Sequence, residues 1–251
     1  MIGIYDIDKA CPTCYKERLN IYKDCGFNEI ALYIDNSYLN KDETYTQIIN
    51  YATSIGLTVK QVHMDYNISN SICDENSNEY FDYLEEKIKE CEKLNIAYLV
   101  AHASKGNEPP EISNIQLEKL KKLTQKHPKV CVCFENVRVN NNLDKILNLK
   151  LDNVKFCFDL GHAHCYGNEK ELFEKYKNLI ACTHLHNNLG KDTHNLLNEG
   201  EIDYKYFLKE LKNISQKQNI SNCLECFPEY GKTLTKDEFI SFVKNCYSSI
   251  K

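Results

Sequence analysis

Residues 155–162 read Lys-Phe-Cys-Phe-Asp-Leu-Gly-His, a short apolar run that stops at a carboxylate and is followed by a histidine. The run Phe156–Phe158 has the length and composition of a buried strand, and Asp159 stands at its carboxyl end. His162 lies one helical turn further on, where Asp159 and His162 can face the same ion. The stretch therefore predicts a strand, a turn into a helix, and polar chemistry at the point where the strand ends.

The same unit recurs along the whole chain, with amphipathic helical stretches between the apolar runs. Residues 80–94 illustrate such a helix, because apolar side chains recur there at helical spacing with lysines and glutamates between them. Strands are predicted at Ile2–Asp6, Glu29–Ile34, Thr58–His63, Ala97–His102, Val130–Glu135, Lys155–Asp159, Ile180–His186 and Cys223–Cys226. Eight parallel strands joined by helical crossovers close a barrel, so we expect an α/β fold, a single-domain (β/α)8 TIM barrel over residues 1–251. A doubly wound open sheet is the alternative, but no glycine-rich phosphate loop follows the first strand.

Charge and composition narrow the class of partner. The 251 residues are 42% hydrophobic and 27% charged, typical of a globular protein, and the formal net charge is −5. The arginines are Arg18 and Arg138, which is few for gripping phosphates. These features argue against nucleic acid as a partner.

The amino terminus reads as a strand rather than a signal peptide, and no apolar run has the length of a membrane span. We therefore expect a cytoplasmic protein without membrane association. Most of the 13 cysteines are predicted to be free thiols, and those in strand-like runs to be buried. Cys11 and Cys14 form a C-x-x-C pair, for which zinc binding, redox chemistry and a purely structural role stay open.

Six predicted strands end on a side chain that can ligate a metal ion. In a parallel barrel all these ends meet at one face, so residues distant in sequence surround one axis. Any one of them alone has a simpler explanation as a cap or loop contact, but six in successive strands predict a divalent-metal site at the mouth. They are His63, His102, Glu135, Asp159, His186 and Glu225.

Glu135 and Glu225 each follow apolar residues on a buried strand, where a carboxylate needs a cation or a strong donor. Pairing of each with a lysine would satisfy that need. Their placement on opposite sides of the mouth instead suits a general acid and base flanking a metal-bound substrate.

The run 183–194 supplies further candidates. His184 and His186 point to the same face of a strand, and we expect His186, nearer the strand end, to be the ligand and His184 a deeper core histidine. Asp192 and His194 have a spacing that lets both reach one centre, although a solvated loop pair has the same spacing. His164 is a candidate for substrate contact or for a surface position.

Three motifs carry a resemblance to a known family that covers nearly the whole chain. They are Phe158-Asp-Leu-Gly-His-Ala163, His184-Leu-His-Asn-Asn188, and Asp192-Thr-His194 leading into Asn198-Glu-Gly-Glu-Ile-Asp203. The sequence resembles the xylose isomerase-like TIM barrel superfamily, which holds sugar and sugar-phosphate isomerases and epimerases as well as endonuclease IV type abasic-site repair enzymes.

The isomerase branch implies one divalent ion held by Glu135, Asp159, His186 and Glu225. The two glutamates then move a proton through a metal-stabilised enediolate of a small sugar, sugar phosphate or polyol, and His162 orients a substrate hydroxyl. Oxygen-rich ligation with one imidazole favours Mn2+, Mg2+ or Co2+. His102, His164 and Lys191 are the substrate-binding candidates, and Lys105, Arg138 and Lys191 those for a phosphate group.

The repair branch implies a three-zinc phosphodiesterase. Its ligands match His63, His102, Glu135, Asp159, His162, His186, Asp192, His194 and Glu225, and Tyr66 stands where that family carries an aromatic. The short loop before Asp192, the scarcity of arginine and the acidic charge favour the isomerase or epimerase, with the zinc hydrolase as the alternative.

A dehydratase, a lyase and a binding barrel stay open. After His186, Asn187 and Asn188 replace acidic residues common in the sugar-isomerase relatives. Pairing of the outer helices would give a homodimer.

Overall fold

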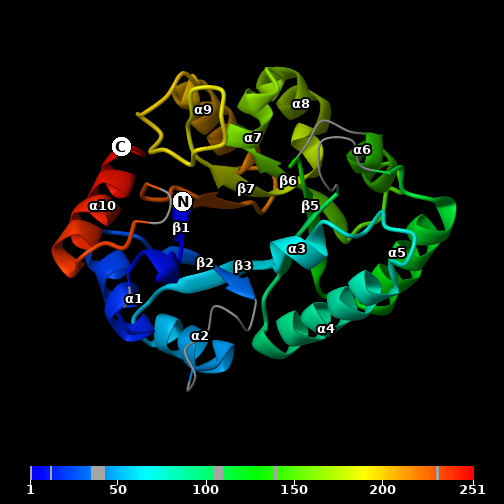
Figure 1. Cartoon of the computed structure of the whole chain (residues 1–251), viewed down its shortest axis with the longest axis horizontal. Coiled ribbons are helices and arrows are strands. Elements are labelled where there is room, and N and C mark those ends of the chain that lie inside the picture. The colour runs from blue at the N-terminus through cyan, green and yellow to red at the C-terminus, as the bar shows by residue number, and fades with distance from the viewer. Residues whose placement is uncertain (1, 12, 35–42, 104–109, 138–140, 230–231) are drawn as a thin grey trace.

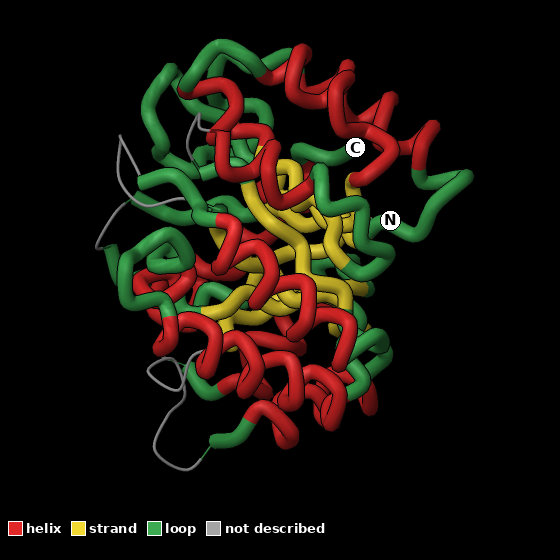
Figure 2. Tube along the Cα trace, turned by 90° about the vertical axis from the view of Figure 1, so that its right-hand side faces the viewer, coloured by secondary structure: helices red, strands yellow, loops and turns green. Residues whose placement is uncertain are grey.

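A computed structural model describes residues 2–11, 13–34, 43–103, 110–137, 141–229 and 232–251. Eight parallel strands pair in sequence order and close on themselves, with β1 hydrogen-bonded to both β2 and β8. The barrel is ringed by helices (Figures 1 and 2). The strands are β1 Ile2–Tyr5, β2 Glu29–Ile34, β3 Thr58–Met64, β4 Tyr98–His102, β5 Cys131–Glu135, β6 Val154–Asp159, β7 Ile180–Leu185 and β8 Ser221–Leu224. The predicted (β/α)8 barrel is confirmed.

Helices lie between the strands, and in Figure 1 the last helix, α10, lies beside the first, α1. The α-helices are α1 Tyr15–Asp24, α2 Tyr45–Ser54, α3 Tyr66–Ser69, α4 Asn78–Leu94, α5 Asn114–Lys126, α6 Asn141–Leu147, α7 Leu160–Cys165, α8 Glu169–Tyr176, α9 Tyr204–Ile214 and α10 Lys236–Ser248. Two 3-10 turns complete the described elements, η1 Asp8–Ala10 and η3 Lys177–Leu179.

Local sequence explains where the outer helices begin and end. The helices α2, α5 and α10 each start with a capping box, in which Thr44, Ser113 and Thr235 exchange hydrogen bonds with the third helical residue. The long helix α4 buries an apolar stripe that includes Leu84 and Ile88, each worth roughly 1.5–3 kcal/mol on burial. It ends at Asn95, whose φ of 56° is a left-handed cap.

The amino-terminal end of the barrel is closed by packed polar side chains. Glu29 is buried and forms an ion pair of 2.7 Å with Lys60 and a hydrogen bond with Ser221. Gln61 donates to the hydroxyl oxygen of Ser221 at 3.1 Å. Because this end is filled, the opposite, carboxyl end is where the interior can meet solvent.

The cysteines are free thiols, and those on the strands pack in the interior. Cys133, Cys157, Cys182 and Cys223 are fully buried, and Cys131 is partly buried. Cys11 is buried and Cys14 is exposed just before α1. Among the described helices, none has the length and apolar character needed to cross a bilayer. The cytoplasmic location and the homodimer stay predictions.

Candidate metal centre

The carboxyl ends of strands β3 to β8 and the loops after them bring the predicted ligands together. Asp159 is the register partner of His184 on the neighbouring strand, and His102 is the register partner of Glu135. Together with His184, the predicted ligands fall into three groups, each with ligand atoms within 4.8 Å of one another, and a fourth such group, Glu135, Cys157 and His184, overlaps the first. The three groups are Glu135, Asp159, His184 and Glu225; His63, His102 and Glu135; and His162, His186, Asp192 and His194.

The central group consists of three carboxylates around one imidazole. Nδ1 of His184 lies 3.3 Å from Oε2 of Glu225, 3.4 Å from Oε2 of Glu135 and 3.8 Å from Oδ2 of Asp159. All four side chains are buried. The sequence predicts His186 for this group, but in the structure His184 takes that place and His186 belongs to the third group.

Hydrogen bonds fix both the backbone and the side chain of Asp159. The side chain of Asn136 accepts from the backbone N–H of Asp159 and donates to its carbonyl, both at 2.8 Å. Oδ1 of Asp159 caps α7 by accepting from the backbone N–H of His162 at 2.6 Å. Its Oδ2 has no hydrogen-bond partner among the described residues, although the residue is fully buried.

The second group places two histidines against Glu135. Nδ1 of His63 lies 2.6 Å from the carbonyl oxygen of Met64, and Nδ1 of His102 lies 2.8 Å from Oδ1 of Asn70. Both partners are acceptors, so each Nδ1 carries the proton and a neutral ring presents the lone pair of Nε2. The two Nε2 atoms are 3.1 Å apart and lie 3.1 and 3.5 Å from Oε2 of Glu135. Lone pairs that converge on a carboxylate repel one another unless a cation lies between them.

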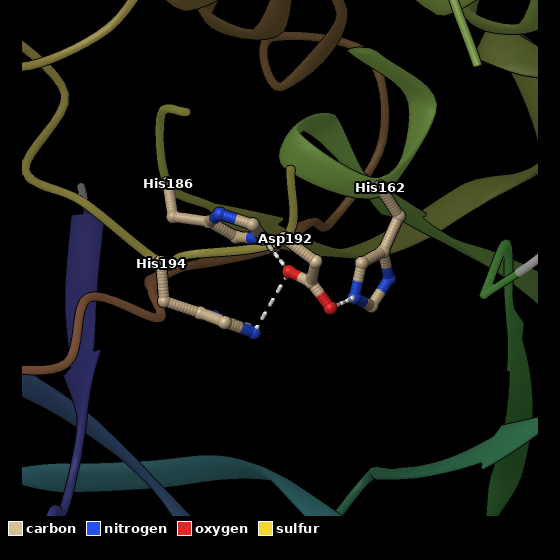
Figure 3. Close-up of side chains that lie close together, drawn as sticks. All are labelled: His162, His186, Asp192 and His194. Carbon is tan, nitrogen blue, oxygen red and sulfur yellow. Dashed lines mark ion pairs between the residues drawn. The ribbon is translucent and has the colours of Figure 1, made fainter. Parts of the chain in front are cut away.

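The third group, shown in Figure 3, includes the most exposed of the candidate ligands, Asp192, which is 45% exposed. Asp192 is between two rings, with Oδ2 3.3 Å from Nε2 of His162 and Oδ1 3.2 Å from Nε2 of His194. Nε2 of His186 is 4.0 Å from Oδ1 of Asp192 and 3.2 Å from Oδ1 of Asp159. The third group therefore adjoins the central one through Asp159.

The loop after β7 is tied down by Asn187. Its Oδ1 accepts from the backbone N–H groups of Asn188 and Ile202, at 2.8 and 3.0 Å, and its Nδ2 donates to the carbonyl of Leu197 at 2.6 Å. A Cβ on Gly200 would lie 2.2 Å from Oδ1 of Asn187, so the close approach requires glycine. Asn187 is 1% exposed and holds the loop that carries Asp192 and His194.

Burial and proximity set the ionisation of the central group. Burial opposes the charged form of Glu135, but the charge of the His184 ring and the nearby His102 and His162 outweigh it, so its pKa is well below the usual range. Burial is likewise outweighed by His184 at Glu225, whose pKa is also lowered. Burial opposes charge on His184 too, yet its pKa is well above 6.5 because negative or electron-rich groups surround it. These groups are Cys157, Tyr5, Glu225 and Glu135.

The pKa values of the other histidines depend on which carboxylates lie near them. Burial disfavours charge on His162, but Asp159 and Asp192 raise its pKa well above the usual value. Burial lowers the pKa of His102 and of His194. At Asp192 burial is outweighed by His162, which lowers the carboxyl pKa to about 2.

These residues fit divalent cations. Buried ligand atoms without a hydrogen-bond partner in the described parts of the chain include Oδ2 of Asp159 and Nδ1 of His184. Such atoms are costly unless a cation or water satisfies them. Three carboxylates and one imidazole suit Mn2+, Mg2+ or Co2+, whereas the histidine-rich second and third groups suit Zn2+.

A cavity of about 1650 Å³ opens onto the three groups and runs along Asp6–Ala10 toward α10. Seven predicted site residues line it: His63, His102, Glu135, His162, Asp192, His194 and Glu225. Asp159, His184 and His186 lie buried behind this lining.

Two of the substrate-binding candidates lie elsewhere. His164 is on α7, with Nδ1 3.6 Å from Oε1 of Glu169, and does not line the cavity. Lys191 is exposed and also outside the lining. His102 is the candidate that the structure brings to the cavity, while Lys105 and Arg138 lie outside the described residues.

Residues 19–240 match the sequence profile of the xylose isomerase-like TIM barrel family. A segment of 83 residues, 32% of this chain and 28% of the relative, is 35% identical to an uncharacterised protein of Methanocaldococcus jannaschii. The chain thus matches under a third of that relative's length.

Solved structures similar to this chain include sugar enzymes. A D-psicose 3-epimerase with D-tagatose, from Clostridium cellulolyticum H10, has a TM-score of 0.75 at 14% identity, covering 99% of this chain and 96% of that one. A sugar phosphate isomerase/epimerase from Parabacteroides distasonis has 0.66 at 16%, covering 98% and 96%. A xylose isomerase-like TIM barrel protein from Mycobacterium smegmatis, in complex with magnesium, has 0.68 at 12%, covering 100% and 97%. At these identities the likeness establishes the fold.

Proposed function

The chain belongs to the xylose isomerase-like TIM barrel family, and on that premise we propose that it is a divalent-metal-dependent isomerase or epimerase of a small sugar, sugar phosphate or polyol. The observation that carries the proposal is the central group, in which Glu135 and Glu225 flank one buried imidazole, His184, together with Asp159. The sugar epimerases and isomerases among the similar folds support it.

A divalent ion held by Glu135, Asp159, His184 and Glu225 would polarise a substrate carbonyl and stabilise negative charge on its oxygen. Glu135 and Glu225 reach the cavity from β5 and from the end of β8, so they can meet a substrate from two sides. One carboxylate removes a proton from the carbon beside the carbonyl, and the other returns a proton on the second face or at the neighbouring carbon. Their lowered pKa values keep both carboxylates ionised in the free protein, so one can accept the substrate proton, and the one that returns a proton must first take it from solvent or from a substrate hydroxyl.

His162 is suited to hold a substrate hydroxyl. It lines the cavity, and its Nδ1 lies 3.0 Å from Oε1 of Glu135. Its Nε2 lies 3.3 Å from Oδ2 of the exposed Asp192, so a substrate hydroxyl could replace Asp192 as the acceptor of this N–H while Glu135 holds Nδ1. His162 would thereby orient the substrate carbon against the carboxylate that takes its proton.

The charge of the cavity favours a small carbohydrate over a polyanion. The basic residues among the described lining residues are Lys9 and Lys232, and the acidic ones besides the ligand carboxylates are Asp6, Asp8, Glu199, Glu229, Asp237 and Glu238. Negative walls repel a nucleic acid backbone, whereas the hydroxyl groups of a sugar can donate hydrogen bonds to carboxylates.

The test is a panel of free and phosphorylated ketoses and aldoses, incubated with the Mn2+, Co2+ or Mg2+ protein in D2O. We expect deuterium to enter one carbon position of one substrate class, followed by NMR, with Glu135→Gln inactive. Binding of metal without exchange in any sugar would contradict the proposal.

A second candidate function, zinc-dependent phosphodiester hydrolysis of the endonuclease IV type, is favoured by a specific observation. Glu135 belongs to both the central and the second group, and the third group adjoins through Asp159, as a trinuclear centre requires. Elemental analysis of protein purified without chelator separates the candidates. About one Mn, Co or Mg per chain supports the isomerase, and two or three zinc ions support the hydrolase.

A further inference from the structure

Two tyrosines on the first two strands contact ligands supplied by the last two strands. Tyr5 on β1 and Tyr33 on β2 lie beside His184 and Glu225, respectively. We propose that Tyr5 and Tyr33 are positioning residues that fix His184 and Glu225 as ligands of the divalent cation. The proposal rests on the metal centre of the proposed function.

Tyr5 controls the orientation of the His184 ring. Its hydroxyl lies 2.9 Å from Nε2 of His184, and the two rings meet edge to face with centroids 5.1 Å apart. Both residues are fully buried, so water does not compete for this contact. With Nε2 protonated and donating to the Tyr5 oxygen, the ring presents the lone pair of Nδ1 to the three carboxylates.

Tyr33 determines which oxygen of Glu225 is available. Its hydroxyl donates to Oε1 of Glu225 at 2.6 Å, a short charge-assisted hydrogen bond. The other oxygen, Oε2, is the one that faces Nδ1 of His184 at 3.3 Å. Because Tyr33 holds Oε1, Glu225 would bind the cation through Oε2 alone.

The two tyrosines support one another. Their ring centroids are 5.0 Å apart, and β1 pairs with both β2 and β8. Tyr33 also lines the cavity, so its ring borders the space where a substrate would lie. Removing the Tyr5 hydroxyl should affect metal binding through His184, and removing the Tyr33 hydroxyl should affect it through Glu225.

The experiment measures Mn2+ affinity of the full chain by competition with a chelating dye, for wild type, Tyr5→Phe and Tyr33→Phe. We expect each variant to bind Mn2+ about 10–100-fold more weakly. Tyr98→Phe is the matched control, because Tyr98 begins β4 at the opposite end of the barrel and donates to the carbonyl of Asn219 at 3.2 Å. It should bind Mn2+ like wild type.

Co2+ absorption and a double-mutant cycle separate positioning from a general loss of structure. Tyr33→Phe should change the visible spectrum of bound Co2+, and its effect on Mn2+ affinity should largely disappear in the Glu225→Gln background. This cycle decides the proposal if Tyr5→Phe does not fold. Unchanged affinity and spectrum in a folded Tyr33→Phe variant would overturn the inference and leave the proposed function standing. A wild-type chain that binds neither Mn2+ nor Co2+ would overturn the metal centre itself.

Discussion

The ring of His186 stacks on the ring of His194, with centroids 4.0 Å apart and planes 20° apart. The ring of His186 also lies against Gly161, the second residue after the end of β6. The third group therefore depends on a residue that has no side chain.

Gly161→Ala is expected to destabilise the protein by roughly 1–3 kcal/mol, because the new Cβ would lie 1.9 Å from Cε1 of His186. The His186 ring must move, which should also weaken Zn2+ binding at the third group. Denaturant unfolding and zinc titration measure the two effects. Gly167→Ala is the control: nothing lies within 4 Å of its Cβ position, and only its φ of 64° penalises alanine. Equal zinc affinity in the Gly161 variant and wild type would contradict this role.

Glu135→Gln and Glu225→Gln are expected to leave the fold intact and to lower turnover by roughly a hundredfold or more, since each keeps size but loses the proton acceptor. Deuterium exchange into the substrate measures the loss, and circular dichroism checks the fold. Glu171→Gln, on the exposed side of α8, should retain full activity. A fully active variant at either glutamate would remove it from the acid and base pair.

Metal affinity is expected to rise with pH. Against the effect of burial, Asp159 raises the pKa values of His162 and His186 above 6.5, and Cys157 and Tyr5 together with the two glutamates raise that of His184, whereas a metal ligand must be unprotonated. Binding should release protons, which calorimetry in buffers of different ionisation enthalpy detects. Affinity that is constant between about pH 6 and 9 would contradict the assignment.

The folding stability of the metal-free protein is expected to fall as pH rises, whereas its metal affinity rises. The charged ring of His184 contributes stability that is complete below its unfolded pKa of about 6.5 and is lost as pH rises through the higher folded value. Denaturant midpoints of the metal-free and Mn2+-loaded protein over this range therefore diverge as pH rises.

Asp8→Asn is expected to raise the free energy of unfolding at pH 7 by about 1–2 kcal/mol, less than the roughly 3 kcal/mol of the full shift, because Asp8 is only partly buried and water screens its charge. Burial, with Asp6 beside it, raises the pKa of Asp8 from 3.8 to about 6. A carboxyl shifted upward costs stability as pH rises from the unfolded to the folded pKa, and the cost is complete at pH 7. Asparagine can still accept from the backbone N–H of Lys9, which Oδ1 of Asp8 does at 2.7 Å. Asp24→Asn, exposed at the end of α1, should change little.

The strands could be predicted within about two residues because buried parallel strands are continuous apolar runs between amphipathic helices. The strand β2 matches its predicted range, and the largest shift is at β8, which begins at Ser221 rather than Cys223. The first residue of a short strand is set by its hydrogen bonds to the neighbouring strands, and the apolar run alone does not show it.

The choice between His184 and His186 could not be made from spacing. Both side chains project from the same face of the strand, but β7 ends at Leu185, and the register with β6 puts His184 level with Asp159. That register includes a shift between Phe156 and Cys157, which no sequence pattern indicates. Tyr5 and Tyr33 were missed for a related reason, since tyrosine in an apolar strand is typical of core packing.

With Tyr5 and Tyr33 included, every strand of the barrel contributes to the metal centre, from β1 through the residue that follows β8. The four ligands of the central group come from β5 to β8 and the residue after it, while the tyrosines that contact two of them lie on β1 and β2, so these contacts are complete only when β1 meets β8. Under the proposed function, metal binding would therefore stabilise the closed ring more than the part from β5 to β8 that carries the ligands, because only the closed ring holds His184 and Glu225 against the two tyrosines.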